Sequence, residues 1–298
     1  MSIGKKDLSI ALNKQNSSLN QLEINLRHTS VISIYYDLSE SKHSSRSYKK
    51  WTANFLKSVT SPLILYTDEP TFANLKPHFV SLDINATIYI GQSHWDFFKL
   101  IEKWRHRFYV EKYMTYQFQQ DPENYIHSPD LYAIWNSKIF LTNKSAHENP
   151  YNSNFFIYND VGAWRLGEIA NWPDSDFCQI LSQKIGDKVL FSQVNEYSMA
   201  NADLIEGGFF AGTHSAIQNL TLEFYRLHDE WMDGKKFIGK DQTLMNELTF
   251  KLIPRRIIRL KAWELKCEKN YNKWFIYQIY LASSEYFKCE NDKFFYLE

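Results

Sequence analysis

The stretch that most constrains this fold is Asn154-Phe155-Phe156-Ile157-Tyr158-Asn159-Asp160-Val161-Gly162. Its first half is a short run of aromatic and β-branched residues, which is typical of a buried strand. The run then ends in an amide, a carboxylate and a glycine. Open α/β sheets bind ligands at the carboxyl ends of their strands. We therefore expect Asp160 to lie at such a site, with the alternative that it only caps the following turn or helix.

Apolar runs and amphipathic segments alternate before this stretch. Strands are expected at 31–36, 63–66 and 87–90, and Tyr48, Trp51, Phe55 and Val59 recur at the spacing of a helix. The run 63–66 is apolar on both faces, as in a strand buried in a parallel sheet. The alternation predicts a right-handed α/β half over about residues 30–92.

Two helices are expected next. One covers 94–120 and ends at Asp121-Pro122; the other begins with Ser128 as N-cap and Pro129 in its first position. Lys138 lies on the apolar stripe of the second helix. Such a lysine either extends to solvent or faces a phosphate group, and the sequence leaves both interpretations open.

Beyond Gly162 the pattern continues with a helix capped by Ser175, a strand at 188–191 and a helix over 217–231. The segment 206–212 holds three of the ten glycines. Adjacent Gly207 and Gly208 beside aromatic residues indicate either a close approach to the backbone or an ordinary bulge or turn. The run 234–241 is not a phosphate-binding loop, because it ends in Asp241 where that motif needs Ser or Thr.

Composition excludes several classes. The 298 residues carry no formal net charge, so no global field favours nucleic acid. No signal-peptide core and no membrane-spanning apolar run occur. Cys178, Cys267 and Cys289 are widely spaced, which favours free buried thiols and a cytoplasmic location.

The segment 251–273 is basic and is interleaved with aromatic residues. Three interpretations remain open: contacts with a diphosphate ligand, a peripheral contact with the inner face of an anionic membrane, or a solvated basic face. Nucleic acid is not expected as a partner, since the whole chain is neutral.

Four features occur in a characteristic order. They are the 31–37 strand followed by Arg46-x-Tyr48-x-x-Trp51; Trp135-Asn136-Ser137-Lys138; 156–162 with Arg165; and 207–212 followed by Asp241-Gln242. Together they resemble the HtrL/YibB family of glycosyltransferases, which is similar to GT-A enzymes, over residues 30–250. The resemblance implies a single compact α/β domain of GT-A-like, Rossmann-related type, with a mixed, mainly parallel sheet flanked by helices. Residues 1–29 would form a polar arm, and 251–298 an extension packed on the same domain.

The resemblance also implies a nucleotide-sugar donor and a glycan or lipid-linked hydroxyl acceptor, as in surface polysaccharide or lipopolysaccharide-type biosynthesis. Asp160 would take the place of the acidic Asp-x-Asp metal site, binding Mn²⁺ or Mg²⁺ together with the diphosphate. The chain departs from that motif, because Tyr158 stands at its first position. Metal dependence is therefore open.

Roles for the remaining candidates follow from the same comparison and from the chemistry of a departing diphosphate. Asp241 would act as the general base in an inverting reaction, or position the sugar in a retaining one. The other candidates are donor-binding residues: Tyr36, Asp37, Lys138, Asn159, Gly207, Gly208 and Gln242. Two competing hypotheses are a non-catalytic nucleotide- or carbohydrate-binding module and an RNA- or membrane-binding protein that uses the basic segment.

Overall fold

The structure, a computed structural model, describes residues 9–11, 29–38, 43–198 and 204–298. Within these ranges the strands form one eight-stranded sheet in the order β1-β4-β3-β2-β5-β7-β6-β8. The strands are β1 (Ser9–Ala11), β2 (Thr29–Ile34), β3 (Leu63–Asp68), β4 (Ala86–Gly91), β5 (Phe155–Asn159), β6 (Val189–Gln193), β7 (Ile205–Gly212) and β8 (Ile257–Lys261). Four of the seven pairings are parallel, which confirms a mixed, mainly parallel sheet.

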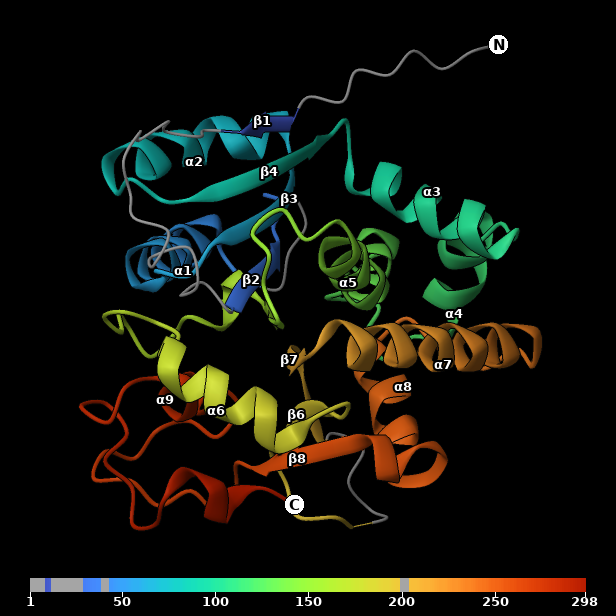
Figure 1. The fold of residues 1–298 in the computed structure, drawn as a ribbon. Coiled ribbons are helices and arrows are strands. Elements are labelled where there is room, and N and C mark those ends of the chain that lie inside the picture. The colour runs from blue at the N-terminus through green and yellow to red at the C-terminus, as the bar shows by residue number, and fades with distance from the viewer. Residues whose placement is uncertain (1–8, 12–28, 39–42, 199–203) are drawn as a thin grey trace.

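Helices cover both faces of this sheet (Figure 1). The α-helices are α1 (Ser45–Ser58), α2 (Glu69–Ser81), α3 (His94–Arg105), α4 (Phe118–Gln120), α5 (Pro129–Glu148), α6 (Ser175–Ile185), α7 (His214–Asp233), α8 (Asp241–Glu247) and α9 (Tyr277–Leu281). α1, α2, α6 and α9 pack on one face, and α3, α5, α7 and α8 on the other. Each face has its own apolar core, so the central strands are buried on both sides, as their apolar runs predict.

The order of the strands reverses beside β2. The chain moves outward from β2 to β3 and β4, and then returns to place β5 on the other side of β2. β2 and β5 are parallel, with Ile32 opposite Tyr158. Their carboxyl ends therefore flank a topological switch point, which is where open α/β sheets form their ligand crevice.

The expected helix over 94–120 is wrong as one element. α3 ends at Arg105, where His106 takes a left-handed conformation with φ of 55°, and a π-helical turn (Lys112–Gln117) follows before α4. The Glu102 carboxylate accepts the backbone N–H groups of Tyr109 (2.6 Å) and Val110 (3.0 Å). These hydrogen bonds to Glu102 compete with continuation of the helix beyond the break. The spacing of apolar residues carries no signal of such bonds.

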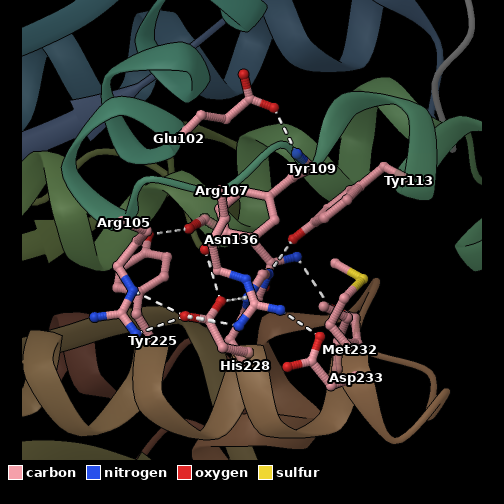
Figure 2. Close-up of polar contacts among 12 residues, drawn as sticks. Glu102, Arg105, Arg107, Tyr109, Tyr113, Asn136, Tyr225, His228, Met232 and Asp233 are labelled. Carbon is pink, nitrogen blue, oxygen red and sulfur yellow. Dashed lines mark hydrogen bonds and ion pairs between the residues drawn. The ribbon is translucent and has the colours of Figure 1, made fainter.

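Polar contacts attach the broken segment to α7 (Figure 2). Asp229, on α7, accepts hydrogen bonds from Arg105 Nε (2.9 Å) and Tyr109 Oη (2.6 Å). The hydroxyl of Tyr113 lies 2.5 Å from His228 Nε2. Two helices that are distant in the sequence are thus joined through a buried carboxylate and a buried imidazole.

The start of α6 also differs from the expectation. Asp174, not Ser175, is the N-cap, and its carboxylate accepts the Phe177 N–H at 2.8 Å. Ser128 does occupy the N-cap position of α5, with Pro129 in the first turn, but its hydroxyl makes no capping hydrogen bond.

The segment after residue 250 belongs to the same sheet and core. β8 pairs with β6 in parallel, and Tyr277 stacks on Phe209 with ring centroids 4.3 Å apart. Several basic side chains here are paired with acids: Lys251 with Glu247, Arg259 with Glu298, and Lys261 with Glu264. The positive charge expected from the sequence is therefore partly neutralised locally.

The expectation of three free thiols is wrong for two of them. Cys267 and Cys289 form a disulfide, and only Cys178 is free and buried among the described cysteines. The backbone pairs Glu268 N–Lys288 O and Glu290 N–Lys266 O align the two segments that carry the bridge. This removes much of the support for a cytoplasmic location, because that expectation rested on reduced cysteines.

The N-terminal arm expected over 1–29 falls mostly outside the described residues. Ser9–Ala11 forms β1, which is antiparallel to β4 at the edge of the sheet. No helix in the described part of the chain has the length and apolar character needed to cross a bilayer.

Candidate active site

A pocket of about 230 Å³ opens at the switch point between β2 and β5. Residues that follow both strands line it, together with residues of α1, α5, β7 and the segment before α9. The polar and aromatic lining residues include Tyr36, Asp37, His43, Tyr48, Trp135, Asp160, Arg165, Glu206 and Phe275.

Asp160 directly follows β5 and is one of three acidic residues that line the pocket, with Asp37 and Glu206. Its backbone N–H donates to Gly208 O at 2.8 Å, so it lies opposite Gly208 on antiparallel β7. Its carboxylate accepts from Tyr158 Oη at 2.6 Å and from Lys138 Nζ at 3.0 Å. About 31% of the side chain remains exposed, so Asp160 contacts both the core and the pocket.

Lys138 lies behind Asp160 on α5, and only 3% of its side chain is exposed. The interpretation in which Lys138 extends to solvent is therefore wrong. Its ammonium lies 3.0 Å from Asp160 Oδ2, 3.0 Å from Gly207 O and 3.1 Å from Asp241 Oδ2. The ammonium therefore donates to two protein oxygens and forms an ion pair with the third. Burial alone lowers the pKa of Lys138, but the two carboxylates outweigh it and raise the pKa above its ordinary value.

Asp241 is the first residue of α8, and its side chain is 6% exposed. Its Oδ1 accepts the N–H of Gln242 at 2.9 Å. Burial raises the pKa of Asp241 to about 6, although Lys138 opposes that shift. Asp241 does not line the pocket; it contacts Lys138 and lies beside Gly207.

Gly207 and Gly208 lie where side chains press against the strand. A Cβ on Gly208 would stand 2.8 Å from Glu206 Oε1 and 2.9 Å from Asp160 Oδ2. A Cβ on Gly207 would stand 3.3 Å from Asp241 Oδ1. Both glycines are within β7, where its pairing with β6 shifts register, so the structure agrees with a close approach and with a bulge, and not with a turn.

Glu206 is a pocket residue to which the sequence analysis gave no role. Its side chain is almost fully buried, and Oε2 has no hydrogen-bond partner among the described residues. Burial, reinforced by the nearby Asp160, raises the pKa of Glu206 to about 8. One sequence signal for Glu206 was available: an acid directly before Gly-Gly, near the start of the strand that pairs with β5.

Arg165 supplies positive charge to the pocket. Its guanidinium stacks on Trp51 at 4.3 Å and on Phe275 at 4.9 Å from the ring centroids. Nε donates to Gly162 O at 3.0 Å, and Nη2 lies 3.1 Å from His43 Nε2. A guanidinium has five N–H donors, so donors remain to bind a ligand.

The other predicted donor-binding residues divide into two groups. Tyr36 and Asp37 line the pocket, and the Tyr36 hydroxyl has no partner in the described ranges. Asn159 is buried on the opposite side, where its amide oxygen accepts from Tyr277 Oη at 2.9 Å. Gln242 donates to the backbone of Ile205 and connects α8 to β7, away from the pocket.

The acidic groups of the pocket suit Mg²⁺ or Mn²⁺. No cluster of three or more His, Cys, Asp and Glu arranged for a metal occurs in the described residues. Mg²⁺ and Mn²⁺ are commonly held by one or two carboxylates with diphosphate oxygens completing the shell. Asp160, exposed to the pocket, and the unpartnered Glu206 oxygen fit that donor set.

Solved structures with a similar fold exist, whereas comparisons of the sequence find no match. No family model matches the chain, and no curated protein matches its sequence. Among solved structures, the apo form of mouse xyloside xylosyltransferase 1 matches with a TM-score of 0.47 and 11% identity, over 77% of this chain and 83% of that chain. The HtrL/YibB resemblance is not supported by these comparisons.

Proposed function

We propose that the chain is a nucleotide-sugar-dependent glycosyltransferase that transfers a sugar to a hydroxyl acceptor. The observation that carries this proposal is the placement of Asp160 in a pocket at the switch point of the sheet, beside Tyr36, Asp37 and Arg165. Asp160 can bind a metal cation, and Arg165 can bind a diphosphate. Tyr36 adds an aromatic group near the end of β2.

Arg165 is the diphosphate-binding cation in this proposal. Lys138 was the sequence-based candidate, but its ammonium contacts three protein oxygens. Arg165 lies in the pocket with donors to spare, and its aromatic neighbours fix the plane of the guanidinium. A planar fork held in this way can bind two oxygens of one phosphate group.

Asp241 has a positioning role in this proposal. Its carboxylate contacts the ammonium that also holds Asp160, and it does not reach the pocket. A general base must come within hydrogen-bond reach of the acceptor hydroxyl, so the buried position of Asp241 disfavours that role. The sugar, the acceptor class and a place in surface-glycan biosynthesis remain expectations from the resemblance.

The test is donor turnover by purified protein, using a panel of nucleoside diphosphate sugars with Mn²⁺, Mg²⁺ or EDTA. Asp160→Asn keeps the size of the side chain and removes its charge, so we expect turnover to fall by at least about a hundredfold, as for loss of a charged transition-state contact. Asp187→Asn, on an exposed loop residue, is the matched control and should be unchanged. Full turnover by folded Asp160→Asn would contradict the proposal.

A second candidate is a nucleotide-binding module without catalysis. The separation of Asp241 from the pocket favours it, since the candidate base does not reach the ligand. This module would gain thermal stability with a nucleoside diphosphate, by about 2.7 kcal/mol at a hundred times the dissociation constant. It would show no donor turnover under any metal condition.

A further inference from the structure

The acidic motif expected after β5 is incomplete, because Tyr158 replaces its first carboxylate. The register of the sheet supplies another acid from the neighbouring strand. Asp160 lies opposite Gly208 on antiparallel β7, and Glu206 is two residues before Gly208. A Cβ at Gly208 would meet both acids, so Glu206 and Asp160 lie on the same side of β7, although the pairing of β7 with β6 is irregular here.

Gly208 allows these two acids to converge. A Cβ at this position would lie within 3 Å of both Glu206 Oε1 (2.8 Å) and Asp160 Oδ2 (2.9 Å). The two carboxylates therefore meet over a backbone position that has no side chain. Both acids also line the pocket, so a ligand there can reach them together.

Of the three acids in this group, Glu206 has no ion pair among the described residues. Asp160, Glu206 and Asp241 are three carboxylates, and Lys138 is the ammonium that pairs with two of them. Glu206 Oε2 is buried and has no hydrogen-bond partner in the described ranges. A buried acidic oxygen without a partner is costly, and binding a cation relieves that cost.

We propose that Glu206 is the second protein ligand of a divalent cation, Mn²⁺ or Mg²⁺, which it binds together with Asp160 across Gly208. The inference rests on the proposed function, because the diphosphate of the donor completes the oxygen shell. Glu206 thus replaces, from β7, the carboxylate that β5 lacks.

The experiment measures Mn²⁺ binding by the full chain through the electron paramagnetic resonance signal of free Mn²⁺. It is run with the metal alone and with inorganic pyrophosphate, which supplies diphosphate oxygens. We expect one bound Mn²⁺ per chain. Glu206→Gln and Asp160→Asn should each weaken binding by at least about tenfold, the lower end of effects at metal sites.

Two further variants serve as controls for the Mn²⁺-binding measurement. Glu206→Asp keeps the carboxylate on a shorter arm and should retain more affinity than Glu206→Gln. Glu223→Gln, a change on α7 away from the pocket, should bind Mn²⁺ like the wild type. Thermal unfolding without metal identifies any variant that fails to fold. If Glu206→Gln does not fold, the Mn²⁺ affinity of Glu206→Asp is compared with that of the wild type, and an unchanged affinity counts against the inference.

Wild-type affinity in folded Glu206→Gln would overturn the inference, as would absence of Mn²⁺ binding by the wild type in both conditions. Either result leaves the proposed function standing if donor turnover persists in EDTA. Normal Mn²⁺ binding without turnover of any donor would instead contradict the proposed function and retain the metal site.

Discussion

Lys138 Nζ lies 3.0 Å from Asp160 Oδ2 although only 3% of the lysine side chain is exposed. The ammonium also lies 3.1 Å from Asp241 Oδ2. A buried charge pair contributes little net stability, but removal of one partner leaves the other uncompensated. Lys138 therefore fixes the position of Asp160 at the pocket while it remains out of contact with solvent.

Lys138→Met should destabilise the protein by about 3–5 kcal/mol, because two acids lose their shared cation. Adding Asp241→Asn should recover part of that loss, since one of the stranded charges is then removed. Urea unfolding of the two single variants and the double variant measures the coupling. Strict additivity would show that the ion pair between Lys138 and Asp241 is unimportant.

Gly208→Ala should reduce Mn²⁺ affinity and donor turnover together, because the added Cβ lies within 3 Å of both pocket carboxylates (2.8 and 2.9 Å). Overpacking of this kind costs about 1–3 kcal/mol. Gly207→Ala is the adjacent comparison, since its nearest contact is longer, at 3.3 Å. Equal losses from the two variants would argue against a special role for position 208.

Asp229→Asn should lower the free energy of unfolding by roughly 3 kcal/mol at neutral pH, through loss of charged hydrogen bonds with Arg105 and Tyr109. The hydrogen bonds from His228, Tyr109 and Arg105 outweigh burial and hold the pKa of Asp229 below its ordinary 3.8. A depressed acid pKa stabilises the fold above the unfolded value and loses that contribution as pH falls. The difference between wild type and variant should therefore shrink below about pH 4. A difference that is constant from pH 7 to pH 3 would contradict this account.

The Cys267–Cys289 bridge closes a loop with a sequence separation of 22. A loop of this size contributes about 3 kcal/mol by restricting the unfolded chain. Cys267→Ser with Cys289→Ser should therefore lower stability by about that amount, and a reducing agent should then have no further effect. Thiol alkylation of the denatured, unreduced wild type should label only Cys178. Labelling of all three cysteines would show that the bridge is not formed.

The sheet could be predicted from the sequence because its central strands are continuous apolar runs, as at Leu63–Tyr66 and Phe155–Tyr158. α2 was not predicted, because a proline such as Pro70 can equally follow the end of a strand. Pro70 lies in the first turn of a helix that Asp68 caps by accepting the Thr71 N–H at 2.9 Å. The same residue types serve as strand terminators and helix starts, so local composition did not separate the two.

The site could be predicted from the sequence only in part. Asp160, Tyr36 and Asp37 could be placed at the pocket because each lies at the end of a predicted strand or directly after it. Glu206 could not, since its role depends on the antiparallel register of β7 against β5, and a sequence does not state which strands pair. The disulfide was missed for the same reason, as it depends on a pairing between two irregular segments.

Tyr277 has a consequence for any attempt to shorten the protein. Its hydroxyl donates to Asn159, the residue before Asp160, and its ring stacks on Phe209 of β7. Phe275, two residues earlier, contacts Arg165 at the pocket. A truncated form ending near residue 250 would retain every acidic residue of the site yet lose the aromatic support beneath it. Expression boundaries and proteolysis experiments should therefore treat the last fifty or so residues as part of the same folded unit as the pocket.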